Sequence, residues 1–165
     1  MTRTNKIKVV VASDQPVVLS GLQNWFDTHE RYRVSVCAPN AELLLSRLEH
    51  AAGELIVMAC TIDSSSEAWP VMREARRRSP DAPIVVLTLQ TDAHQLRAIH
   101  TAGAAGIVSK HDDVRELERV CSRVLSGMTQ VMSKSVAALC DAARSFDGAA
   151  YRGVRLTVKA FNAPS

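Results

Sequence analysis

The stretch Leu55-Ile56-Val57-Met58-Ala59-Cys60-Thr61 decides how the rest of the chain is interpreted. It opens with four large apolar residues, follows a Gly-Glu step and leads into a polar segment. A short apolar run between turn signals predicts a strand that is buried on both faces. The segments Ile7–Ala12 and Pro83–Leu87 have the same form, so we expect all three as strands of a parallel sheet.

Helical patterns alternate with these strands along the chain. An edge strand is expected over Arg33–Cys37, where apolar and polar residues alternate, and a last strand over Gly106–Ser109. The expected helices run over Pro16–Asp27, Ala41–Ala52, about Trp69 to Arg78, about Asp92 to Ala102, and Asp112–Ser126. Five strands alternating with five helices predict an α/β fold with helices on both faces of the sheet.

Composition suits one soluble domain with a tail. The chain has 165 residues, 47% of them apolar, and a net charge of +3, which is too weak by itself to indicate nucleic acid binding. No signal peptide or membrane-spanning run is visible, so a cytoplasmic location is expected. The four cysteines lack metal or redox spacing and are expected to be reduced and mostly buried; they are Cys37, Cys60, Cys121 and Cys140.

The chain changes character after Gly127. We expect the main domain to cover residues 6–127 and a linker to cover residues 128–146. Within that linker, Ser133 is placed to cap a short amphipathic helix over Val136–Ala143. Residues 147–165 lack clear periodicity, so a loosely ordered tail is expected there.

Polar side chains stand where the predicted strands end. Asp14, Thr88 and Lys110 each follow or close a strand, and Ala59 closes the strand in the middle. In an open parallel sheet, ligands bind beyond the carboxyl ends of the strands. Carboxylate, hydroxyl and ammonium groups suit phosphoryl chemistry, whereas the methyl group of Ala59 has no role in it.

Three stretches carry a resemblance to a known family: Val-Val-Val-Ala-Ser-Asp-Gln-Pro-Val-Val-Leu-Ser-Gly-Leu (9–22), Pro-Asp-Ala-Pro-Ile-Val-Val-Leu-Thr (80–88) and Gly-Ala-Ala-Gly-Ile-Val-Ser-Lys (103–110). Together they resemble the receiver domains of bacterial two-component response regulators, in the subclass with a LuxR-type (NarL-type) helix-turn-helix after the receiver. The resemblance covers about Lys8 to Val136. It implies a flavodoxin-like (CheY-like), doubly wound, five-stranded parallel sheet in the order 2-1-3-4-5.

The resemblance also implies roles for the strand ends. In that family, two acids after the first strand hold Mg²⁺, and an Asp after the third strand accepts a phosphoryl group. A Thr or Ser and a Lys then bind the phosphoryl oxygens. Carried over by position, Ala59 falls on the acceptor, Thr88 and Lys110 on the phosphate-binding pair. The degenerate counterpart of the acidic metal site consists of Ser13, Asp14 and Thr61.

Loss of two carboxylates changes what this site is expected to do. Ala59 has no nucleophilic atom, so no phosphoryl group is expected there, and no catalytic residue is assigned. Asp14 is expected to bind Mg²⁺ weakly at most and to pair with Lys110. No other cofactor or metal is expected.

The sequence therefore predicts a non-enzymatic, phosphorylation-independent receiver module that acts by protein–protein contact in signal transduction and transcriptional regulation. A homodimer is expected, with Arg115, Glu118 and Arg119 on the exposed side of the last helix as a candidate face. A histidine kinase remains a potential partner, and no membrane contact is expected. Arg155–Lys159 resembles the opening of a LuxR-type DNA-binding domain, but DNA binding by this chain is not expected.

Two alternatives stay open. Asp63, four residues after Ala59, is a second candidate for phosphorylation. Removal of two carboxylates also leaves a less negative pocket, which suits a small-molecule sensor.

Overall fold

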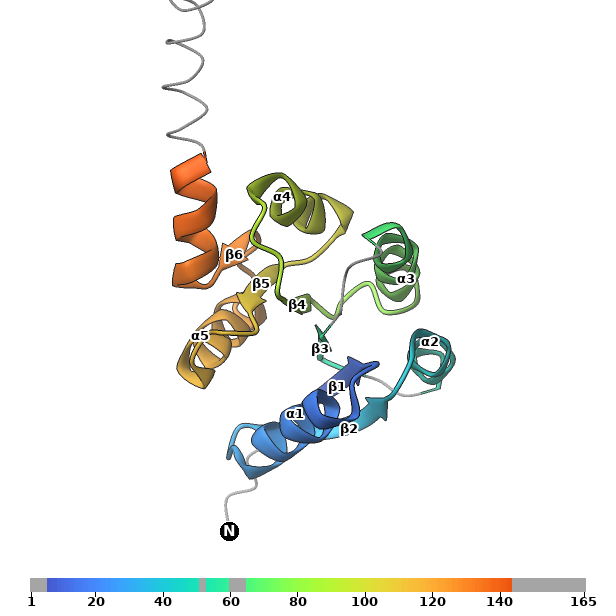
Figure 1. The fold of residues 1–165 in the computed structure, drawn as a ribbon. Coiled ribbons are helices and arrows are strands. Elements are labelled where there is room, and N and C mark those ends of the chain that lie inside the picture. The colour runs from blue at the N-terminus through green and yellow to red at the C-terminus, as the bar shows by residue number, and fades with distance from the viewer. Residues whose placement is uncertain (1–5, 51–52, 60–64, 144–165) are drawn as a thin grey trace, which may run out of the picture.

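A six-stranded parallel sheet lies at the centre of the structure, a computed structural model that describes residues 6–50, 53–59 and 65–143, with only the backbone at 65–69. The strands are β1 (Ile7–Ser13), β2 (Tyr32–Ala38), β3 (Leu55–Ala59), β4 (Ile84–Thr88), β5 (Gly106–Ser109) and β6 (Val131–Met132). Their order is β2-β1-β3-β4-β5-β6 (Figure 1). The predicted order is confirmed for the first five strands, and the predicted number of strands is too low by the short β6.

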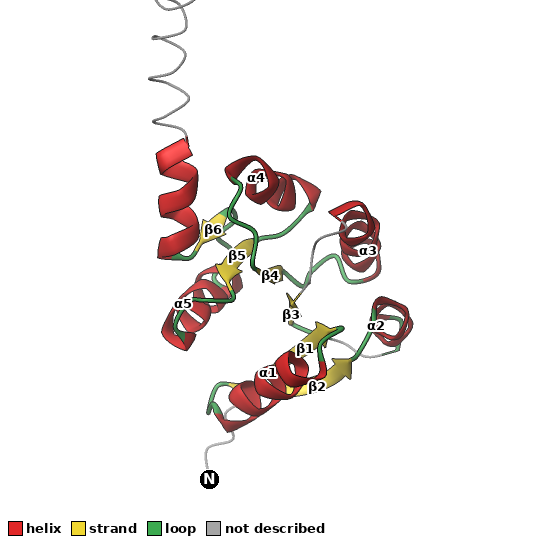
Figure 2. Ribbon diagram, viewed as in Figure 1, coloured by secondary structure: helices red, strands yellow, loops and turns green. Residues whose placement is uncertain are grey.

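Helices cover both faces of this sheet, as predicted. They are α1 (Pro16–Thr28), α2 (Ala41–Leu48), α3 (Ser65–Arg78), α4 (Ala93–Ala102), α5 (Val114–Leu125) and a further helix over residues 134–143. Figure 2 shows α1 and α5 on one side of the strands and α2, α3 and α4 on the other. The doubly wound α/β fold is therefore confirmed.

Two apolar clusters hold these layers together, one on each face of the sheet. Leu22 and Phe26 of α1 pack with Leu117 and Val120 of α5 over one face. Side chains of α2, α3 and α4 pack over the other face, together with Val136 from the helix at 134–143. All five residues of β3 and all five of β4 are buried, because these central strands are covered on both sides.

Several predicted helix ends are confirmed by the backbone contacts. The side chain of Asn40 accepts a hydrogen bond from Leu43 N at 2.8 Å, and Asp113 accepts one from Arg115 N at 2.9 Å. These side chains satisfy amide groups that lack partners in the first turn of a helix. Gly103, with φ of +126°, ends α4, where the left-handed region favours glycine.

Two helix boundaries differ from the prediction. The second helix ends at Leu48 rather than Ala52, with Glu49 at its C-cap. The third helix begins at Ser65, so Pro70 lies inside it rather than in its first turn. Proline is tolerated in the first turn of a helix, whereas in the interior it removes a hydrogen bond and its ring crowds the carbonyl group four residues earlier. Pro70 in the sequence therefore favours a helix start near Trp69, and the structure places that start earlier.

The segment after Gly127 adds structure to the sheet and to the core. Val131 N donates to Ala105 O, and Ser133 N donates to Ile107 O, both at 2.9 Å, so the chain pairs along β5. Val136 and Cys140 on the following helix are 0% and 2% exposed. The segment predicted as a linker thus supplies an edge strand and part of the core.

The described cysteines are free thiols. Cys121 and Cys140 are buried, and Cys37 is partly exposed. Burial raises the pKa of the Cys121 thiol to about 12, so this side chain stays protonated and unreactive. Cys60, Thr61 and Asp63 lie outside the described residues, as does the predicted tail at 147–165.

Candidate functional site

The ends of β1, β3, β4 and β5 lie side by side at the carboxyl edge of the sheet. In the parallel register, Ser13 lies opposite Ala59, Ala59 opposite Leu87, and Thr88 opposite Ser109. Lys110 follows β5 directly, and its backbone N donates to Thr88 O at 2.9 Å. The structure therefore brings the predicted site residues of the described chain to one edge.

Ala59 lies between these polar strand ends as part of the apolar core. It is 2% exposed and belongs to the same buried cluster as Val57, Leu87 and Val108. A methyl group in this position carries no lone pair and no proton to transfer. The middle of the edge is thus chemically inert.

The hydroxyl groups on either side of Ala59 close turns of the backbone. Ser13 Oγ accepts a hydrogen bond from Gln15 N at 3.1 Å, and Thr88 Oγ1 accepts one from Gln90 N at 3.0 Å. Ser13 and Thr88 are 5% and 1% exposed. Side-chain oxygens that bond the backbone two residues later fix the start of the following loop.

The amino group of Lys110 reaches across the edge to the turn after β1. Its Nζ donates to the amide oxygen Oε1 of Gln15 at 3.1 Å. Asp14 is exposed beside this contact. Sequence reasoning missed Gln15, which precedes the first residue of α1 and carries the acceptor for Lys110. The predicted pair between Asp14 and Lys110 stays a prediction, and Thr61 and Asp63 lie outside the described residues.

The donor set at this edge suits Mg²⁺ poorly. Mg²⁺ is held by carboxylates and waters in an octahedron. A hydroxyl group at Ser13 and a methyl group at Ala59 stand at two of the three carboxylate positions that the resemblance implies. Within the described ranges, no group of three or more His, Cys, Asp or Glu side chains is placed to hold a metal ion.

Two of the three residues of the candidate dimer face on α5, Glu118 and Arg119, make contacts within the chain. Glu118 Oε1 lies 3.1 Å from His29 Nε2 at the end of α1. Arg31 N donates to His29 Nδ1 at 3.3 Å, so Nε2 carries the hydrogen of the neutral ring. Arg119 donates to Glu116 at 2.9 Å and to Met132 O at 2.8 Å. Of the three predicted residues, Arg115 is exposed, and Glu118 and Arg119 are partly exposed.

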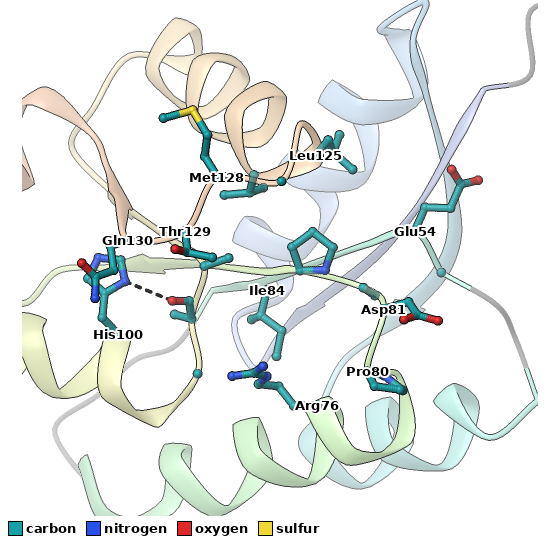
Figure 3. Close-up of a pocket in the computed structure, with 18 residues that line it drawn as sticks. Glu54, Arg76, Pro80, Asp81, Ile84, His100, Leu125, Met128, Thr129 and Gln130 are labelled. Carbon is teal, nitrogen blue, oxygen red and sulfur yellow. Dashed lines mark hydrogen bonds between the residues drawn. The ribbon is translucent and has the colours of Figure 1, made fainter.

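A hollow of about 700 Å³ lies at the opposite, amino edge of the sheet (Figure 3). Its walls come from the segments that lead into β3, β4, β5 and β6 and from the last turns of α3, α4 and α5. His100 Nδ1 lies 3.0 Å from Ala104 O and therefore donates, while burial lowers the pKa of the ring. This hollow is separate from the predicted site, and short Gly- and Pro-containing loops are its only sign in the sequence.

None of the helices in the described part of the chain is long and apolar enough to cross a membrane.

Comparison with known proteins assigns the family. A family model described as the response regulator receiver domain matches residues 9–122. The probable transcriptional regulatory protein SgaR of Hyphomicrobium methylovorum is 24% identical over 123 residues, which cover 74% of this chain and 58% of SgaR. The chain thus spans little more than half the length of this curated relative.

Solved structures share the fold. A two-component response regulator of the LuxR family from Aurantimonas sp. SI85-9A1 has a TM-score of 0.76 at 22% identity, covering 86% of this chain and 99% of that one. The isolated REC domain of RcsB from Salmonella enterica serovar Typhimurium, with phosphomimetic BeF3−, has a TM-score of 0.71 at 22% identity, covering 82% and 99%. A structure of two RcsB dimers bound to two parallel DNAs has a TM-score of 0.74 at 22% identity, covering 83% and 68%.

Proposed function

Because the chain belongs to the response regulator receiver domain family, we propose that it is a receiver that has lost phosphoryl transfer at its usual acceptor position and signals by protein–protein contact. One observation carries this proposal. Ala59 closes β3 at the centre of the carboxyl edge, opposite Ser13 and Leu87, and is 2% exposed. An acyl phosphate needs a carboxylate oxygen, and the side chain at this place has none.

The remaining polar residues support a fixed edge rather than a catalytic one. Ser13 and Thr88 each bond the backbone of their own loop, and Lys110 bonds the neutral amide of Gln15. A hydrogen bond between Lys110 and Gln15 ties the loop after β5 to the turn after β1. We propose weak Mg²⁺ binding at most, through Asp14, because a single carboxylate makes a poor cage for the ion.

Thermal melting with beryllofluoride tests this proposal. Beryllofluoride with Mg²⁺ mimics a phosphoryl group on a carboxylate, so the wild type is expected to melt at the same temperature with and without it. The Ser13→Asp, Ala59→Asp double variant restores the missing carboxylates and is expected to melt higher when the two reagents are present. A rise in the melting temperature of the wild type equal to that of the variant would contradict the proposal.

We propose a role in transcriptional regulation through a homodimer, with a histidine kinase as a further candidate partner. The names of SgaR and of the RcsB dimers on DNA support this proposal. The exposed guanidinium of Arg115 on α5 suits a charged, symmetric interface.

Sedimentation of the wild type beside the Arg115→Glu variant tests this interface. Equal dimer fractions in both proteins would exclude Arg115 from it. A cytoplasmic location and the absence of DNA binding by this chain stay predictions.

The alternative of a small-molecule sensor at the same edge has less support. The side chains that would line the vacated pocket, Ser13, Ala59 and Thr88, are 5%, 2% and 1% exposed. They are covered, and two of them are engaged in backbone turns. No contact in the described chain favours phosphorylation at a second residue.

A further inference from the structure

A carboxylate two residues after Lys110 joins the loop of the candidate site to the last described helix. Asp112 Oδ2 accepts a hydrogen bond from Ser109 N at 2.9 Å, and Asp112 Oδ1 accepts one from Ser135 Oγ at 2.6 Å. Ser109 closes β5, and Ser135 lies in the first turn of the helix at 134–143. One side chain thus connects the end of a central strand with the start of the helix.

A second carboxylate, in the first turn of α5, makes a parallel connection. Glu116 Oε1 accepts a hydrogen bond from Lys134 N at 2.6 Å, and Glu116 Oε2 accepts one from Arg119 Nε at 2.9 Å. Arg119 in turn donates to Met132 O at 2.8 Å. The first amide groups of a helix lack partners within it, and a negative charge there also suits the helix dipole. Glu116 therefore holds the helix at its amino end.

The body of this helix is held by packing. Val136 and Cys140 are 0% and 2% exposed and belong to the same apolar cluster as Leu96 and Ile99 of α4 and Ile107 of β5. Figure 1 shows the helix beside β6, at the edge of the sheet. Charged contacts hold the amino end of this helix, and apolar contacts hold the rest of it against the core.

We propose that Asp112 and Glu116 form a clamp through which the loop that carries Lys110 sets the position of the helix at 134–143. The loop is anchored on its other side by the bond from Lys110 Nζ to Gln15 Oε1. A partner that contacts Gln15 or Lys110 therefore changes how firmly the helix is docked. This proposal rests on the proposed function in one respect, namely that the signal reaches the clamp without a phosphoryl group.

Hydrogen exchange of the full chain, measured by mass spectrometry without any phosphoryl donor, tests the clamp. In a Glu116→Ala, Ser135→Ala double variant, exchange at residues 131–143 is expected to rise by about tenfold, while β1 and β3 exchange as in the wild type. Arg123→Ala is the matched control, because Arg123 is exposed on α5 and its side chain lies outside the clamp. Unchanged exchange at 131–143, or an equal rise in β1 and β3, overturns the proposal.

A second pair of variants tests the link to the candidate site. Lys110→Met keeps the unbranched stem of the side chain and removes the amino group that donates to Gln15. It is expected to raise exchange at residues 134–143 in the wild-type background and to add nothing in the double variant, because coupled contacts are not additive. No effect in the wild-type background, or a purely additive effect, overturns the link. A wild type that proved to be phosphorylated would refute the proposed function and leave this result unchanged.

Discussion

The residue at position 59 sets the electrostatics of the whole carboxyl edge. Neighbouring carboxylates repel each other, and a bound cation relieves that repulsion. With methyl and hydroxyl groups at Ala59 and Ser13, Lys110 faces less negative charge than two further carboxylates would give, and its amino group donates to the neutral amide of Gln15. Lys110 and Gln15 therefore connect two loops of this edge through protein atoms.

A carboxylate returned to position 59 is expected to destabilise the protein unless Mg²⁺ is present. Ala59→Asp places a charge at a site that is 2% exposed, so the free energy of unfolding is expected to fall by about 1–3 kcal/mol without Mg²⁺. Added Mg²⁺ is expected to recover part of this loss by bridging the introduced carboxylate and the carboxylate of Asp14. Urea unfolding with and without MgCl₂ measures both effects.

The matched control is Ala59→Asn, which has the same size and no charge. Its loss of stability is expected to be insensitive to Mg²⁺, because an amide is a weak ligand for the ion. An equal response of the two variants to MgCl₂ would show that the carboxylate at this edge does not recruit the metal.

Glu116 is expected to make the stability of the protein depend on pH in the acid range. Hydrogen bonds from Arg119 and from the Lys134 amide lower the pKa of Glu116 from its usual 4.5 to about 2. Because the pKa is lower in the folded state, the contribution is complete above the usual value and is lost as the pH falls from about 4.5 towards 2. Glu116→Gln is expected to cost about 1 kcal/mol at pH 7 and almost nothing near pH 2. Chemical denaturation of both proteins across this range measures the difference, and a constant difference at every pH would contradict the assignment.

At the scale of elements, the helix at 134–143 belongs to the same core as α4 and β5. A linker outside the domain would leave its apolar side chains in water, whereas Val131, Val136 and Cys140 are 5%, 0% and 2% exposed. The two-residue strand β6 also covers the outer side of β5. An edge strand that is covered in this way is protected from pairing with other chains.

Truncation is expected to show this difference directly. A chain that ends after Gly127 is expected to lose several kcal/mol of stability, at about 1.5–3 kcal/mol for each large apolar side chain that loses its burial. A chain that ends after Ala143 keeps β6 and the helix at 134–143, so it is expected to be more stable than the shorter chain. Thermal and urea unfolding of the two truncated chains provide the comparison. Equal stability of both would mean that the segment from β6 onwards contributes nothing to the domain.

At the scale of the whole molecule, the buried strands determine how much of the fold is predictable from sequence. Continuous apolar runs such as Leu55–Met58 predict central strands, and the structure buries every residue of β3. The helix predicted over Asp112–Ser126 likewise corresponds to α5, which runs over Val114–Leu125 with Asp113 at its N-cap. These features are local, so a short window of sequence is enough to recognise them.

The features that sequence reasoning missed depend on contacts between distant segments. Val131–Met132 is too short to show an alternating pattern, and only its pairing with β5 makes it a strand. The partner of Lys110 is 95 residues away in the chain, and the choice of Gln15 follows from the packing of two loops. The connection from Asp112 to Ser135 also joins distant segments, because β6 lies between its two ends in the chain and pairs with β5.

Intact mass spectrometry after incubation with acetyl phosphate and Mg²⁺ tests the central claim most directly, with Ala59→Asp measured alongside. The account predicts that the wild-type mass stays unchanged, because Ala59 offers no oxygen to the phosphoryl group, while the variant gains the mass of one phosphoryl group. A phosphorylated wild type would contradict the account, and peptide mapping would then identify the residue that serves as the acceptor in place of Ala59.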